Sequence, residues 1–241
     1  MPDRHSSNLG DMTHRTLRGK IGYFRNRLGE IGREWFTVTV MPDGTRTLRA
    51  QCEMDDDVVL RDVTYSVDAA WRPLDAFIRL SVDGQFVGSS WFRFVDRLVE
   101  CEAYTRAEGR ISQRVELAAP AVRFGTHSLI TDGWHGALWQ KNGPAIQAIL
   151  AQPASSHAAN GATGPLLLLG DSRLKRIGEE RLRVPAGAFD TTHFEILLVD
   201  FPALHFWVTA RDVQLVRIEW QHLDAYYELL EYEETESAAS I

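Results

Sequence analysis

The chain has 241 residues, 44% of them hydrophobic, and a formal net charge of -7 at pH 7. The acidic balance argues against nucleic-acid binding, because nucleic-acid-binding domains normally carry a basic surface. No apolar run reaches the roughly 18 residues that a spanning helix requires, so we expect no membrane span. The polar N-terminus lacks an apolar segment typical of a signal peptide, and we therefore expect a cytoplasmic protein.

Residues 1–18 are polar and show no periodic pattern, so we expect a flexible N-terminal arm. From residue 19 onward the pattern predicts one strand after another. Phe36, Val38 and Val40 alternate with polar residues, which is the period of two expected for a strand with one buried face. Turn signals such as Asp83-Gly84 separate the runs and indicate antiparallel hairpins.

The strand pattern breaks near residues 118–120, and the segment 124–139 that follows holds two histidines, one aspartate and two tryptophans. The next stretch, 142–151, predicts a helix, because Asn142 can cap its first turn and apolar residues recur at helical spacing. We expect a helical insert over about 124–151. Residues 152–164 are small and polar, which indicates a flexible loop that could act as a lid.

Strand patterns resume at residue 165 and continue to about residue 235, and residues 236–241 are expected to form an acidic tail. No helix pattern lies between successive strands, which argues against a parallel sheet. We predict a mostly β protein with a single domain over 19–235. About a dozen strands would form one large curved antiparallel sheet, a half-barrel or open barrel, with the short helical insert covering its concave face.

Several turn and strand motifs resemble a bacterial family of unknown function whose fold is similar to that of the lipoprotein localisation factors. The motifs are Leu182-Arg-Val-Pro-Ala-Gly-Ala-Phe-Asp-Thr191, Trp207-Val-Thr-Ala-Arg-Asp-Val-Gln-Leu-Val-Arg-Ile218, Tyr226-Tyr-Glu-Leu229, Leu28-Gly-Glu-Ile-Gly-Arg-Glu34 and Tyr65-Ser-Val-Asp68 with Arg72-Pro73. The resemblance covers about residues 19–235 and implies a half-barrel with an apolar concave cavity. In the localisation factors such a cavity holds lipid acyl chains.

The segment 124–139 supplies the first candidate ligand-binding residues: His127, Asp132, Trp134, His135 and Trp139. A histidine oriented by an aspartate can act as a general base near neutral pH, so His127, Asp132 and His135 are the catalytic candidates if the protein is an enzyme. The tryptophans could wall an apolar or aromatic ligand. The alternative is that Asp132 starts a turn, the tryptophans fill the barrel and the histidines bond to local backbone groups.

Three further candidates lie in the predicted strands: Arg61, Tyr65 and Trp91. An arginine inside a curved sheet could anchor a ligand carboxylate or phosphate. The alternative for Arg61 is a cross-strand ion pair at the surface. The histidine spacings match no common zinc motif, although His193, His205 and His222 could converge from separate strands. We expect neither a metal nor a cofactor.

Familiar nucleotide-binding, hydrolase and zinc-protease motifs are absent from the sequence. We therefore expect a protein that binds a small hydrophobic or aromatic molecule in the concave cavity. One alternative is a cofactor-independent enzyme that uses His and Asp side chains on such a ligand. Another is a structural or assembly protein, and a homodimer is left open.

Overall fold

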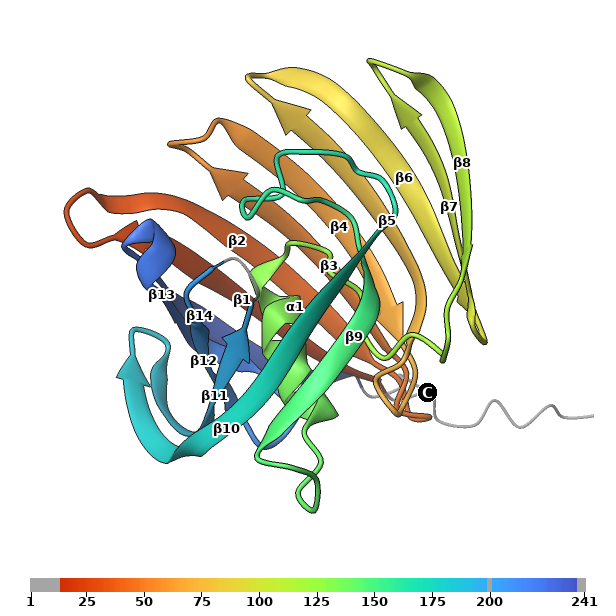
Figure 1. The fold of residues 1–241 in the computed structure, drawn as a ribbon. Helices are drawn as coiled ribbons and strands as arrows, with labels where there is room; N and C mark the ends of the chain where they lie inside the picture. The colour runs from red at the N-terminus through yellow and green to blue at the C-terminus, as the bar shows by residue number, and fades with distance from the viewer. Residues whose placement is uncertain (1–13, 199–200, 238–241) are drawn as a thin grey trace, which may run out of the picture.

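A computed structural model of the chain describes residues 14–198 and 201–237. Fourteen strands in these ranges form one antiparallel sheet in the order β8-β7-β6-β5-β4-β3-β2-β1-β14-β13-β12-β11-β10-β9. The two outermost strands of this order, β8 and β9, are not paired with each other, so the sheet does not close into a barrel. Figure 1 shows the sheet curving around the short helix α1. The prediction of a curved antiparallel sheet with a helix on its concave side is confirmed.

The N-terminal half of the sheet is a meander of eight strands: β1 (His14–Arg25), β2 (Gly29–Val40), β3 (Arg46–Met54), β4 (Val59–Val67), β5 (Pro73–Val82), β6 (Gln85–Val95), β7 (Leu98–Thr105) and β8 (Gly109–Glu116). The C-terminal half contributes six: β9 (Ile146–Ala154), β10 (Leu168–Val184), β11 (Gly187–Leu197), β12 (Leu204–Thr209), β13 (Leu215–Trp220) and β14 (Ala225–Ser237). The helical elements are α1 (Leu129–Gly133) and the two 3-10 turns η1 (Trp134–Leu138) and η2 (Gln221–Leu223).

Alternation along the strands places the core on one face of the sheet. In β4, every second side chain from Val59 to Val67 is buried, and the residues between them are partly or fully exposed. Phe92 and Phe206, from opposite halves of the sheet, are both fully buried. The period of two visible in the sequence therefore identifies the concave face correctly.

Strand β1 pairs with β14 as well as with β2, so both ends of the described chain lie inside the sheet. The prediction of a flexible arm is wrong for residues 14–18, because Leu17 is buried and Arg15 forms an ion pair with Glu234. The predicted acidic tail likewise begins too early, since Glu236 and Ser237 belong to β14. Residues 1–13 and 238–241 lie outside the described ranges.

The helix predicted over 142–151 is wrong, because Ile146–Ala154 forms β9 at the edge of the sheet. Its neighbour β10 supplies backbone hydrogen-bond partners, and this tertiary pairing overrides the weak helix preference of the segment. Of the apolar residues that suggested a helical face, Ile149 is buried but Leu150 is 60% exposed. Pro153 is tolerated because β9 is an edge strand.

The loop predicted over 152–164 is partly strand and partly buried. Gln152–Ala154 ends β9, and Ser155 and Ser156 are buried. Ser155 lies on the concave side of the sheet, where Arg61 of β4 donates to its hydroxyl. The bond from Ser155 N–H to the carbonyl of Gly125, at 2.9 Å, ties this loop to the central segment. No helix in the described part of the chain is long and apolar enough to cross a membrane.

Candidate functional site

The segment that follows β8 enters the concave side of the sheet, and a buried carboxylate holds its helix in place. Glu34 of β2 is fully buried. It accepts hydrogen bonds from Ser128 Oγ at 2.8 Å, from the N–H groups of Leu129 at 2.7 Å and Ile130 at 3.1 Å, and from Tyr23 at 3.0 Å. Burial raises the pKa of Glu34, and these donors oppose that shift. The carboxylate of Glu34 on β2 therefore caps the N-terminus of α1, where backbone N–H groups have no partner within the helix.

Arg61 of β4 is the second buried charge beneath the segment. Its Nε donates to the carbonyl of Thr126 at 2.8 Å, Nη1 to the carbonyl of Gly161 at 2.8 Å and Nη2 to Ser155 Oγ at 2.6 Å. Burial lowers its pKa to about 10, so the guanidinium is still charged at neutral pH. All three of its nitrogens bond to protein oxygens, so Arg61 fastens two loops to the sheet.

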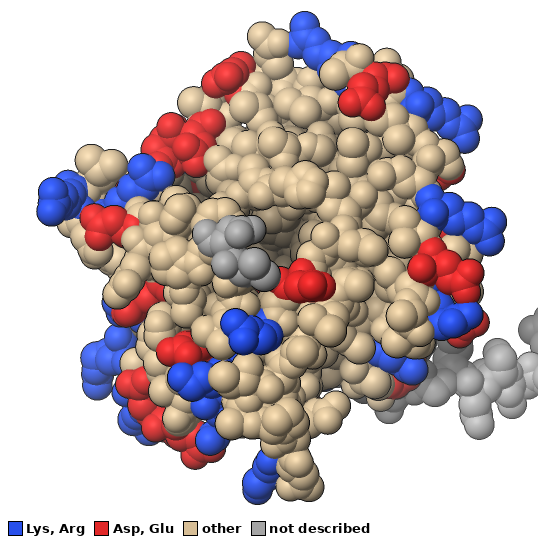
Figure 2. All heavy atoms as spheres, in the orientation of Figure 1, with Lys and Arg blue, Asp and Glu red and all other residues tan. Residues whose placement is uncertain are grey.

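A cavity of about 420 Å³ lies between this segment and the strands of the C-terminal half. One wall is apolar and includes Ile196, Leu198, Leu204 and Trp220. Figure 2 shows a hollow near the centre of the face in view, surrounded mainly by uncharged residues. The facing wall is polar and includes Arg123, His127, Asp132 and His135, and Ser156, His157 and Asp171 also line the cavity.

His135 forms a chain of polar contacts with Arg123. Arg123 Nη1 donates to His135 Nε2 at 3.0 Å, because a guanidinium cannot accept a hydrogen bond. His135 Nδ1 then donates to the backbone carbonyl of Asp132 at 2.8 Å, which fixes a neutral imidazole. Burial and the charge of Arg123 lower the pKa of His135 to about 3.

His127 occupies a left-handed backbone conformation, with φ of 61°, and bonds to the loop that borders the cavity. Its Nε2 lies 3.0 Å from the carbonyl of Ser156 and donates to it. Burial, and next the charge of Arg61, lower the pKa of His127 to about 3. Neither His127 nor His135 is hydrogen-bonded to a described carboxylate, so the two do not form the His–Asp pair that general-base catalysis would use.

The Asp132 side chain faces the cavity and differs from the other buried carboxylate. No described residue donates a hydrogen bond to it, whereas Glu34 has several donors. Burial raises the pKa of Asp132 to about 7; the charge of Glu34 adds to this shift, and the charge of Arg123 opposes it. The polar wall therefore carries a carboxyl group that gains or loses its proton near neutral pH.

Arg123 lines the cavity but was not among the residues predicted from the sequence. Among the described residues, its buried Nε has no hydrogen-bond partner, and its one side-chain hydrogen bond is to His135. Burial lowers the pKa of Arg123, and the charges of Asp132, Tyr65 and Asp171 oppose that shift. The sequence feature that could have identified it is its position between the apolar residues Val122 and Phe124, close to the point where the strand pattern ends.

The other five predicted ligand-binding residues lie away from the cavity. Tyr65 and Trp134 pack against each other with ring centroids 5.6 Å apart, in the buried aromatic cluster. Trp139 packs near Phe194 at the rim of the core. Trp91 is 42% exposed on the outer face of β6, and Arg61 is the loop anchor described above. The structure thus brings together only His127, Asp132 and His135 from the predicted set.

The histidines considered as metal ligands lie in two places. His193 Nε2 and His205 Nδ1 are 3.0 Å apart on the outer face, and His193 stacks on Trp207. His222 packs against Phe201, far along the chain from that pair. Among the residues of ranges 14–198 and 201–237, no group of three or more His, Cys, Asp or Glu side chains is placed to hold a metal ion.

Comparison with known proteins supports the fold and leaves the activity open. No protein-family model and no curated protein matches the sequence. A β-barrel-like protein of the domain of unknown function DUF1849 from Brucella abortus has a similar structure, with 11% identity, a TM-score of 0.52, and coverage of 92% of this chain and 97% of that one. A Bacteroides fragilis protein with a YmcC-like fold matches over 91% of this chain and 95% of its own, with 11% identity and a TM-score of 0.29. The first likeness shows a shared fold alone.

Proposed function

We propose that this protein binds a small hydrophobic or aromatic molecule in the cavity on the concave side of its sheet. The observation that carries the proposal is the pairing of an apolar wall, with Ile196, Leu204 and Trp220, and a polar wall built on Arg123 and Asp132. Ligand sites are typically cavities of roughly 300–1,000 Å³, lined mainly by apolar groups with a few placed polar groups. The cavity volume of about 420 Å³ falls in that range.

The buried charged residues that hold the polar wall in place also favour a binding site. Glu34 and Arg61 are buried charges, and each hydrogen-bonds to the segment or to the loops at the cavity. Such supports hold a site in a defined shape before the ligand arrives, which reduces the free-energy cost of ordering on binding. The sequence motifs resemble a family whose fold is similar to that of the lipoprotein localisation factors, and an apolar ligand in this position agrees with that resemblance.

Two glycines of β10 provide a matched test. Gly170 lines the cavity, and a Cβ atom added there would meet no heavy atom within 4 Å. Gly178 lies on the same strand outside the cavity, and a Cβ atom added there also meets nothing. Both positions therefore accept a larger side chain without an immediate clash, but only the first lies where a ligand would sit.

The experiment titrates the neutral fluorescent probe N-phenyl-1-naphthylamine into the wild-type protein, Gly170→Trp and Gly178→Trp. We expect saturable binding to the wild type and to Gly178→Trp, with affinity for Gly170→Trp reduced by about tenfold or more, a loss of about 1.4 kcal/mol. Equal affinity in all three proteins would place the probe elsewhere and reject the cavity as the site. Absence of saturable binding to the wild type would also reject the proposal.

A further inference from the structure

Arg123 differs from the other buried arginines in what surrounds its charge. The Nε atoms of Arg25, Arg46 and Arg123 are all buried, and none has a hydrogen-bond partner in the described part of the chain. Arg25 nevertheless forms an ion pair with Asp56 at 3.0 Å, and Arg46 forms one with Asp212 at 3.6 Å. Arg123 has no ion-pair partner within 4.0 Å among the described residues, and only His135 accepts from it.

Arg61 provides the contrast inside the same site. It too lacks an ion-pair partner among the described residues, but all three of its nitrogens bond to protein oxygens. An arginine carries five N–H donors, and a charge taken out of water is costly unless partners compensate it. Arg61 is compensated by the fold, whereas Arg123, at the wall of a cavity, has N–H donors with no partner among the described residues.

The groups around Arg123 leave its charge incompletely balanced. Asp132 and Asp171 are close enough to act on it electrostatically, but neither forms an ion pair with it. Asp171 already accepts a hydrogen bond from the N–H of Ala151 at 2.6 Å. Burial lowers the pKa of His127 and of His135, so both imidazoles are neutral, and each is bonded to a backbone carbonyl. Among the described residues that line the cavity, Arg123 is the one arginine or lysine that a negatively charged ligand group would meet.

Building on the proposed function, we infer that the ligand is an amphiphile with a carboxylate head group, which pairs with Arg123 while its apolar body lies along Ile196, Leu198 and Leu204. A carboxylate is the preferred head group because its two oxygens match the planar donors of a guanidinium in a bidentate pair. The head group would bind beside His135, and the apolar body would extend toward Trp220 on the facing wall.

The test compares decanoate with decanamide, which has the same chain length and no charge, as competitors of N-phenyl-1-naphthylamine. We expect wild-type protein to bind decanoate about tenfold more tightly than decanamide, consistent with a charge-assisted hydrogen bond. Arg123→Gln should remove that preference and leave the affinity for decanamide within about threefold. Arg123→Lys, which keeps the charge without the planar fork, should retain part of it.

Each outcome decides between the two proposals. Equal affinity of the wild type for the acid and the amide, with the neutral probe bound, overturns the head-group inference and leaves the proposed function standing. A preference for decanoate that survives in Arg123→Gln also overturns it, because another group must then hold the anion. No binding of the probe, the acid or the amide rejects the proposed function, and the inference with it. The wild-type comparison does not depend on any variant folding correctly.

Discussion

The carboxylate of Glu34 on β2 lies 2.8 Å from the hydroxyl of Ser128, although 94 residues separate them in the chain. The same carboxylate accepts from the first backbone N–H groups of α1 and from Tyr23 of the neighbouring strand. Ser128 itself makes no side-chain cap on this helix. The buried side chain of Glu34 therefore supplies hydrogen-bond acceptors for these amides and also fixes the polar wall against the sheet.

Replacing Glu34 with Gln should destabilise the protein strongly. Glutamine has a similar shape but turns one acceptor into an NH₂ group that faces donors, so buried hydrogen bonds are lost at a cost of about 3 kcal/mol. This cost can be measured by comparing the free energies of urea unfolding of Glu34→Gln and of the control variant Glu30→Gln with that of the wild type. Glu30 lies on the same strand but is exposed and pairs only with Arg33, at 3.1 Å, so its variant should change stability little. Similar values for both variants would contradict the capping role.

Loss of Arg61 should release the loop that borders the cavity. Arg61→Met removes donors to Thr126, Gly161 and Ser155, and the unfolding free energy should fall by about 3 kcal/mol. Hydrogen exchange should accelerate in residues 155–161 more than elsewhere, because local opening becomes easier. Arg79→Met, at an arginine that stacks over Phe86 on the outer face, is the control. Unchanged exchange in 155–161 would show that the loop is held by other contacts.

Asp132 should make stability fall as pH rises toward neutrality. Its folded pKa is raised to about 7, above the value of about 4 in an unfolded chain. The folded state therefore holds the proton more tightly, and its advantage is complete below pH 4 and lost as pH rises through 7. Asp132→Asn removes this dependence, so it should be more stable than the wild type at pH 8 by on the order of 4 kcal/mol and nearly equal at pH 4. A pH-independent difference between the two proteins would contradict this account.

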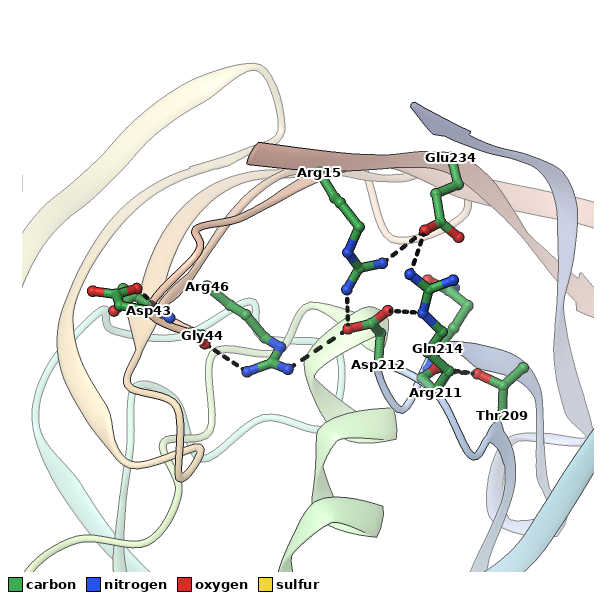
Figure 3. A network of polar contacts seen from close by, with 10 residues as sticks. Arg15, Asp43, Gly44, Arg46, Thr209, Arg211, Asp212, Gln214 and Glu234 are labelled. Atoms are coloured by element: carbon green, nitrogen blue, oxygen red, sulfur yellow. Dashed lines mark hydrogen bonds and ion pairs between the residues drawn. The ribbon is translucent and has the colours of Figure 1, made fainter. Parts of the chain in front are cut away.

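Asp212 connects the first strand to the turn between β12 and β13. Figure 3 shows it surrounded by Arg15, Arg46 and Arg211. The distance from Arg15 Nη2 to the carboxylate of Asp212 is 2.8 Å. Burial favours a higher pKa for Asp212, but the hydrogen bond from Arg15 and the arginine charges outweigh it and lower the pKa. Its stabilising contribution is therefore present above pH 4 and is lost as the carboxylate becomes protonated in acid.

Asp212→Asn should cost about 2 kcal/mol at pH 7, because among the described residues the partly buried Arg46 then has no ion-pair partner and Arg15 keeps Glu234 alone. Asparagine tolerates the left-handed conformation found at this position, with φ of 60°, so the backbone should be retained. Asp190→Asn is a suitable control, since its pair with Arg181 is exposed and should contribute little. Thermal unfolding at pH 7 and pH 3 should show a larger difference at pH 7 than at pH 3.

The strands were predictable because the alternation of apolar and polar residues is a local signal. The same alternation also marks two charged side chains as buried. Glu34 shares the buried face with Phe36 and Val38, two and four residues further along β2. Arg61 shares the buried face with Val59 and Val63 of β4. A charged residue in phase with an apolar face is a signal for a buried charge with partners. The identity of those partners depends on segments almost a hundred residues away, which the sequence pattern does not contain.

The errors have physical causes of the same kind. Residues 146–154 have apolar spacing compatible with a helix, and only the presence of β10 as a pairing partner decides that they form β9. Arg61 and Arg123 are both arginines in apolar surroundings, and their different roles depend on how many of their donors the fold satisfies. Trp91 was a candidate because tryptophan suits a ligand wall, but its position in β6 places it on the outer face. These distinctions are properties of the assembled sheet.

The location of a bound ligand tests the central claim most directly. Methyl-labelled protein with unlabelled N-phenyl-1-naphthylamine can be examined by isotope-filtered nuclear Overhauser spectroscopy, which detects ligand protons close to individual methyl groups. We predict cross-peaks to the methyl groups of Ile196, Leu198 and Leu204, and their loss in Gly170→Trp but not in Gly178→Trp. Cross-peaks confined to methyl groups of the outer face, such as Leu60, would contradict ligand binding in the concave cavity.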